Sequence, residues 1–397
     1  MEIIRNLTRR KLRNTLTISG IVIGVLALVT MGAMAEKFNA LIDGGVAYFG
    51  GNIQVGAAGS SAFGGGSVLP LTTVNQIERV NGVAAAFPEI QVAAKPGAVS
   101  TVSFGLPDYI TAYDPRANDY SSVKTTLVKG RDVNGPGEVV LGSDFAHEFS
   151  KGVGNTIDLP IRPSDASAAF VNHSFTVVGV LAKTQTGPDT GAFINLQDAQ
   201  MLLKDSLPAA IRDRIDTVTL VTGVTVYGNH GVNLDNLADT INNQVGGVKA
   251  TKPSTIVNSF KSGGALFTAI TTGAALLALI VGGLSVINTM LMAVTERVRE
   301  IGLKKAVGAH TRHILREYLL EATLIGAIGG TIGLLLGWGI TSLVNAATAA
   351  SNLSLFLVSW RLVIIALVFS VGLGAIAGII PALRASRMDP VRALRAA

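Results

Sequence analysis

Side chains able to do chemistry are few in this sequence and far apart. There is no cysteine, which removes disulfides, thiolate metal sites and cysteine nucleophiles together. His147 is followed by Glu148, but the second histidine of a zinc-binding H-E-x-x-H helix is missing. His310 and His313 lie three residues apart in a basic segment, where a solvated or headgroup-facing pair is favoured over a metal site. We therefore expect no metal and no catalytic residue in this chain.

A phosphate-binding loop is missing as well. Such a loop follows the pattern G-x-x-x-x-G-K-[ST], in which backbone N–H groups and the lysine hold the phosphates. The segment Lys261-Ser262-Gly263-Gly264 has a lysine and glycines, but in the wrong order. We expect no bound nucleotide or other cofactor, and the chain is not expected to be an enzyme.

The composition points instead to a membrane. Of the 397 residues, 15% are charged and 49% are hydrophobic, whereas a soluble protein carries roughly a quarter charged residues. Four stretches contain no formal charge at all, and each is long enough for a helix of roughly 20 residues to cross a bilayer. They cover residues 14–35, 262–295, 322–360 and 362–383. The sequence therefore predicts a multi-pass α-helical protein with four transmembrane helices.

Basic residues orient these helices. Five lysines and arginines precede the first stretch, six lie in 296–321 and four follow the last stretch. Because basic flanks stay on the cytoplasmic side, both termini and 296–321 are expected in the cytoplasm of a cell-membrane protein. A cleaved signal peptide is the alternative for the first stretch, but its uncharged run exceeds the usual 7–15 residues, so a retained anchor is favoured.

The large segment between the first two helices has a different pattern of residues. Short β-branched runs at 52–55, 138–141, 175–180 and 216–221 alternate with helical patterns at 73–80, 196–204 and 234–244. This predicts an α+β domain outside the cytoplasm. The expected division of the chain is a basic segment 1–15, helices 16–35, 262–295, 322–346 and 361–383, an outer domain 36–261, an inner loop 296–321, an outer loop 347–360 and a tail 384–397.

Glycines recur every four residues in the third helix, at Gly329, Gly333 and Gly337. Such stripes let helices approach closely in lipid. Packing within a dimer and packing within one chain both remain open. No acidic, basic or histidine side chain lies inside the spans, which argues against a proton or ion path.

The inner loop carries the most informative pattern. Val294, Val298 and Ile301 recur at helical spacing, with charges mostly on the other faces. A basic amphipathic helix can lie along the membrane surface, or it can dock into a groove of a partner. The residues alone favour the membrane-surface interpretation, with docking as the alternative.

A set of short motifs runs through the second half of the chain. They are Asn288, Glu296-Arg297, Glu300-Ile301-Gly302, Ala306-Val307-Gly308-Ala309, Glu321-Ala322, Gly329-Gly330, Gly333, Pro381-Ala382-Leu383-Arg384-Ala385 and the tail 389–395. Through these motifs the chain resembles the FtsX-like permease domain of type VII (MacB-type) ABC transporters. The outer segment is similar to that family's periplasmic core domain through Val139-Val140-Leu141-Gly142, Gly154 and 175–180.

The resemblance implies a permease subunit that takes its ATPase from a separate cytoplasmic ABC ATPase subunit, which binds ATP and Mg. It also implies a second permease chain, in a homodimer or heterodimer, and it favours docking for the inner loop. The expected coupling residues have three roles. Glu296, Arg297 and Glu300 make ionic contacts to the ATPase, Ile301 and Ala306 pack, and Gly302, Gly308 and Ala309 shape the following turn.

The expected function is mechanotransmission. Movements of the ATPases pass through helices near 36–48 and 255–264 to the outer domain, which exports or extracts a lipophilic, peptide or lipoprotein cargo. The alternative is an FtsX-like regulator that activates an extracytoplasmic partner, such as a cell-wall hydrolase, without transport. A membrane-fusion adaptor is a further candidate partner besides membrane lipid, and no nucleic acid is expected.

Overall fold

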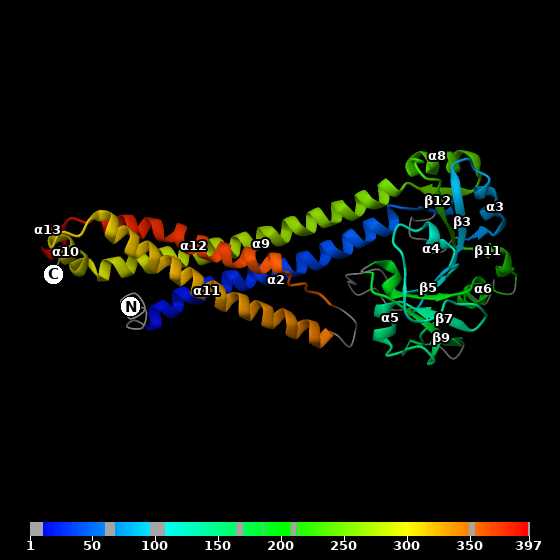
Figure 1. The fold of residues 1–397 in the computed structure, drawn as a ribbon, viewed down its shortest axis with the longest axis horizontal. Coiled ribbons are helices and arrows are strands. Elements are labelled where there is room, and N and C mark those ends of the chain that lie inside the picture. The colour runs from blue at the N-terminus through cyan, green and yellow to red at the C-terminus, as the bar shows by residue number, and fades with distance from the viewer. Residues whose placement is uncertain are drawn as a thin grey trace. The chain divides into compact units, whose positions relative to one another are not determined.

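The computed structural model describes residues 11–59, 68–95, 108–163, 170–184, 186–207, 212, 214–348 and 354–395 (Figure 1). The chain divides into two compact units. The helical unit comprises residues 1–37, 265–349 and 354–397, and the α/β unit comprises 38–264 with 350–353.

Four helices are long and apolar enough to cross a membrane, which confirms the predicted fold class. Each contains most or all of the uncharged stretch that predicted it, because only a helix satisfies every backbone polar group of one segment inside lipid. Two further short helices, α10 (Val298–Ala306) and α13 (Pro390–Arg395), complete the described part of the helical unit. The long helices are α2 (Lys11–Phe49), α9 (Pro253–Glu296), α11 (Thr311–Thr348) and α12 (Trp360–Ser386).

Glycines bring the long helices close together. The predicted stripe on α11 lies against α2 of the same chain, where a Cβ added to each glycine would come within 2.9 Å of the Cβ of a fully buried residue. Small residues also face each other where α11 crosses α12, since a Cβ on Gly326 would lie 3.1 Å from the Cα of Gly374. The stripe pairs are Gly329 with Ile21, Gly333 with Val25, and Gly337 with Val29.

The α/β unit contains two larger sheets and one small one. The first is antiparallel, with the order β13-β1-β12-β3, and the second is mixed, with the order β4-β5-β10-β7-β9-β6 and β8 beside β9. The first sheet consists of β1 (Ile53–Ala57), β3 (Val83–Glu89), β12 (Gly223–Gly228) and β13 (Val248–Thr251). The second consists of β4 (Gln91–Ala93), β5 (Tyr109–Ala112), β6 (Leu127–Gly130), β7 (Glu138–Leu141), β8 (Thr156–Leu159), β9 (His173–Leu181) and β10 (Gly191–Ile194). The small sheet pairs β2 (Leu69–Pro70) with β11 (Leu220–Val221).

Short helices cover these sheets, and polar caps start the two longest of them. Asn195 and Asn233 each accept a hydrogen bond from the backbone N–H three residues later, a preferred N-cap arrangement. Buried side chains from both larger sheets, such as Val55 and Phe175, belong to one hydrophobic core. The helices are α3 (Thr72–Glu78), α4 (Ala117–Tyr120), α5 (Ser143–Glu148), α6 (Leu196–Ser206) and α8 (Leu234–Gln244), with 3₁₀ turns at Gly187–Thr190 and Thr217–Thr219.

Most local predictions for this unit are confirmed: strands form around 53–55, 138–141 and 175–180, and helices form at all three predicted positions. The strand predicted over 216–221 is wrong. The Asp216 side chain accepts a hydrogen bond from the N–H of Val218 and starts a 3₁₀ turn, so only Leu220–Val221 is extended. The longer strand that follows, β12, was not predicted.

Candidate coupling site

The helical spacing of Val294, Val298 and Ile301 predicted one continuous helix, but the structure has a break between α9 and α10. α9 ends at Glu296, and Arg297 leaves helical geometry with φ −105° and ψ 18° before α10 begins. At the other end, Gly308 has a φ of +99°, which glycine adopts without steric cost. The N–H groups of Gly308 and Ala309 return to the carbonyls of Lys305 and Lys304, each at 3.0 Å, and close the helix.

One face of α10 packs against the chain's own C-terminal helix. Ile301 and Gly302 are buried, and a Cβ on Gly302 would lie 2.7 Å from the Cβ of Ala393 in α13. The Lys305 ammonium donates a hydrogen bond to the carbonyl oxygen of Met388 at 2.8 Å. Gly302 therefore permits close helix packing in the middle of α10, and its predicted place in the following turn is wrong.

The face of α10 that points away from α13 is exposed to solvent. Glu296 and Glu300 are exposed, as is Ala306. Two apolar side chains beside them are exposed too, Leu303 at 58% and Val307 at 82%. Sequence reasoning missed this apolar pair, although its spacing of four residues places both on one helix face. Acidic and apolar side chains thus form a mixed exposed surface, which we call the α10 face (Glu296, Glu300, Leu303, Ala306 and Val307).

Arg297 does not belong to that face. Its guanidinium lies 3.5 Å from the carboxylate of Glu321 in α11, with side-chain exposures of 16% and 10%. Lys304 makes a second link to α11 through Glu317 at 2.7 Å. These two ion pairs link the loop to the start of α11, one at the N-terminal end of α10 and one near its C-terminal end.

Two family models match the chain and together cover most of it. The MacB-like periplasmic core domain matches residues 15–263, and the C-terminal domain of FtsX-like permeases matches residues 272–390. This chain belongs to the MacB-type family of FtsX-like ABC transporter permeases. The α10 face therefore lies within the permease domain of this family.

Individual relatives agree with this assignment. The chain is 30% identical to a macrolide export ATP-binding/permease protein MacB of Nitrobacter winogradskyi, over 96% of this chain and 58% of the relative. It is 28% identical to a pyoverdine export ATP-binding/permease protein PvdT of Pseudomonas fluorescens, over 97% and 57%. An uncharacterized ABC transporter permease YknZ of Bacillus subtilis is 40% identical over 131 residues, 33% of this chain and 32% of the relative. The chain thus spans about three-fifths of the length of the first two relatives.

Among solved structures, the periplasmic region of MacB from Actinobacillus actinomycetemcomitans is similar, with 11% identity and a TM-score of 0.34. The match covers 54% of this chain and 94% of that structure.

Proposed function

We propose that this chain is the permease subunit of an ATP-driven exporter and that the α10 face docks a separate cytoplasmic ATPase subunit. The observation that carries the proposal is the pairing of exposed acidic with exposed apolar side chains on α10. Leu303 and Val307 are apolar groups left open to the solvent at a helix end, a composition typical of partner surfaces. Glu296 and Glu300 would supply the ionic contacts, while Ile301 and Gly302 hold α10 on α13 from behind.

Orientation follows from the charges. The basic residues of the lead, the 296–321 segment and the tail would lie in the cytoplasm, and the α/β unit would lie outside. The α10 face would then be on the side where ATP is hydrolysed.

Two helices provide the route for movement between the sides. α2 and α9 each contribute residues to both units. Within the helical unit they touch closely at Gly24, where an added Cβ would lie 3.1 Å from the carbonyl oxygen of Ala278. Within the α/β unit the rings of Phe49 and Phe260 stack with centroids 5.9 Å apart. A pair of helices in contact within each unit can transmit displacement as a lever, without a polar path through the spans.

The cargo would be a lipophilic, peptide or lipoprotein molecule handled by the α/β unit, and two permease chains would work together. Relatives named for macrolide and pyoverdine export support an exporter over other ABC functions.

Co-purification tests the docking. Each ABC ATPase subunit of the source organism is co-expressed with the tagged full chain. The double variant Glu296→Lys/Glu300→Lys should lose the ATPase that the unchanged chain retains. The matched control is Glu78→Lys, which reverses an exposed glutamate on α3 of the α/β unit and should retain the ATPase. Retention by the double variant, with normal membrane insertion, would contradict docking at this face.

A further inference from the structure

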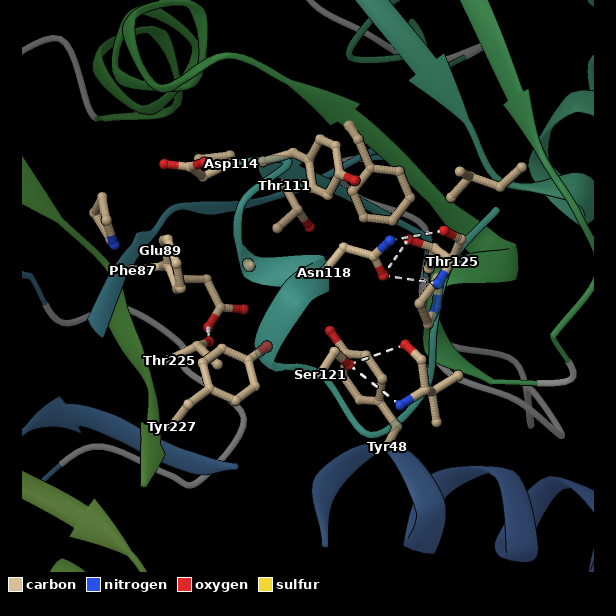
Figure 2. Close-up of a pocket in the computed structure, with 18 residues that line it drawn as sticks. Tyr48, Phe87, Glu89, Thr111, Asp114, Asn118, Ser121, Thr125, Thr225 and Tyr227 are labelled. Carbon is tan, nitrogen blue, oxygen red and sulfur yellow. Dashed lines mark hydrogen bonds between the residues drawn. The ribbon is translucent and has the colours of Figure 1, made fainter. Parts of the chain in front are cut away.

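The α/β unit contains a cavity of about 90 Å³ where its two larger sheets meet. β3 of the first sheet ends at Glu89, a single residue follows, and β4 of the second sheet begins at Gln91. Glu89 therefore stands at the junction, and its side chain lines the cavity (Figure 2). This site lies apart from the α10 face and is not used in the proposed coupling.

The carboxylate of Glu89 is held by neutral groups. The Thr225 hydroxyl donates to one carboxylate oxygen at 2.7 Å, and the Gln91 amide donates to the other. Among the residues that the structure describes, none of the ion pairs includes Glu89. Burial raises the pKa of this carboxyl, and the two hydrogen bonds only partly offset that effect. A partly buried carboxylate that is held by two neutral donors, and by no cation among the described residues, can still pair with a cationic ligand, because charges removed from water are normally paired.

Aromatic rings form much of the remaining wall. Phe87 and Tyr227 meet edge to face with ring centroids 6.0 Å apart, and Tyr113 meets Phe193 in the same way at 5.5 Å. Tyr48 reaches the cavity from α2, opposite the strand that carries Tyr227 (Figure 2). Ring faces carry negative electrostatic potential and attract cations within about 6 Å.

We propose that this cavity binds the ammonium group of a small organic amine. The ammonium would pair with Glu89 and lie against the rings of Tyr48 and Tyr227, which line the same cavity. Drug-sized ligands need pockets of roughly 300–1,000 Å³, and the cavity is smaller than that. It therefore fits an ammonium head with a short alkyl chain.

The fold does not depend on the Glu89 side chain. The backbone carbonyl of Glu89 accepts hydrogen bonds from the N–H and the hydroxyl of Thr222, at 2.9 and 3.1 Å, and these hold the strand junction. Glu89→Gln keeps this backbone, the shape of the side chain and an acceptor for Thr225. It removes the charge and the acceptor for the Gln91 amide, which can rotate so that its own oxygen accepts from the new NH₂ group. The variant should fold normally, which separates binding from structure.

Titration calorimetry of the full chain in detergent micelles, with n-propylammonium chloride as the probe, tests the proposal. We expect saturable binding of n-propylammonium and none of propan-1-ol, which has the same chain without the charge. Glu89→Gln should bind roughly 10-fold more weakly or worse, since hydrogen bonds to charged groups are the strong ones. Tyr227→Phe, which keeps the ring, should bind nearly as the unchanged chain does, whereas Tyr227→Leu should weaken binding. Glu78→Gln, at an exposed glutamate of the same unit, is the matched control for charge loss.

The pH profile gives a second readout. Protons compete with the ammonium for Glu89, so binding should strengthen as pH rises through the raised pKa of this carboxyl, and Glu89→Gln should show a flat profile. The other ionisable groups facing the cavity are Tyr48 from α2, Tyr113 and Asp114 after β5, and Tyr227 from β12. Burial raises the pKa of Tyr113 and brings that of Tyr227 to about 12, and the neighbouring Arg116 lowers the pKa of Asp114. Glu89, whose pKa is raised above its ordinary value, is therefore the group expected to control the pH dependence of binding.

Three results would overturn the proposal: no saturable binding of n-propylammonium, equal binding of propan-1-ol, or unchanged affinity in Glu89→Gln. Unfolding temperatures of all variants, measured in the same micelles, show whether a loss of binding comes from a loss of fold. If Glu89→Gln unfolds, Thr225→Val is measured in its place. Thr225→Val keeps the carboxylate of Glu89 and removes one of the two neutral groups that donate to it. Thr225→Val should still bind n-propylammonium, and its failure to bind would count against an ionic site.

Discussion

The guanidinium of Arg297 lies 3.5 Å from the carboxylate of Glu321, and both side chains are largely buried. Arg297 is the residue at which α9 stops and α10 begins, and Glu321 lies in the first third of α11. The pair therefore joins the break in the inner loop to the next long helix. In the proposed mechanism, a force applied to the α10 face would reach α11 through this ion pair and through Lys304 with Glu317.

Removing one partner of the Arg297–Glu321 pair should destabilise the helical unit. Arg297→Met or Glu321→Met removes one charge of this largely buried ion pair, at a cost of roughly 3 kcal/mol in the free energy of unfolding. The double variant Arg297→Met/Glu321→Met should recover most of that loss. Denaturant unfolding in mixed micelles measures all four proteins. Losses that simply add, with a coupling energy below about 0.5 kcal/mol, would show that the two residues do not interact.

The glycine stripe of α11 should tolerate no added methyl group. In Gly333→Ala the new Cβ would meet the carbonyl oxygen of Val22 at 2.8 Å and the Cβ of Val25 at 2.9 Å. Such overpacking typically costs about 1–3 kcal/mol, so the unfolding temperature in micelles should fall. Gly339→Ala, on the same helix, has no atom within 4 Å of its new Cβ. It should be neutral or slightly stabilising, because alanine favours helix more than glycine does. Equal effects of the two substitutions would contradict packing of α11 on α2.

Glu138 should give the α/β unit a stabilising contribution that disappears in acid. Its carboxylate accepts hydrogen bonds from the Arg131 guanidinium and from the N–H groups of Asn134 and Gly135, which lowers its pKa to about 2. Because the folded pKa is below the unfolded value, this stability is fully present above about pH 4.5 and is lost as pH falls toward 2. Thermal unfolding of the chain and of Glu138→Gln from pH 6 to pH 2.5 checks this. The gap between the two unfolding temperatures should narrow in acid, and a constant gap would refute the assignment.

Length and charge were enough to predict the four spans, because a membrane leaves few alternatives for a long uncharged segment. The spacing of Gly329, Gly333 and Gly337 predicted a close helix contact. It did not identify the partner, and the structure supplies α2 of the same chain. A glycine stripe can pack against a helix of the same chain or of a neighbouring chain. The choice depends on tertiary packing, which the spacing of the glycines does not predict.

The geometry of the candidate coupling site was predictable in part. Its position and the exposure of Glu296 and Glu300 followed from the charge pattern of the inner loop. The partner of Arg297 did not, since Glu321 lies 24 residues further along and many carboxylates were equally eligible. The cavity was not predictable at all: Tyr48, Glu89 and Tyr227 come from elements far apart in the sequence, and only the pairing of β3 with β12 brings two of them together.

In the proposed mechanism, a separate ATPase moves the α/β unit through a chain that is expected to bind no nucleotide itself. The most direct test is the distance between two α/β units in the assembled transporter. Since the chain has no cysteine, a spin label on Asn243→Cys, at an exposed position of α8, reports only that site. Double electron–electron resonance is recorded with the ATPase bound in lipid nanodiscs, without nucleotide and with a non-hydrolysable ATP analogue. We predict that the nucleotide shifts the distance distribution and that Glu296→Lys/Glu300→Lys abolishes the shift. Identical distributions with and without nucleotide, in a complex that hydrolyses ATP, would contradict the account.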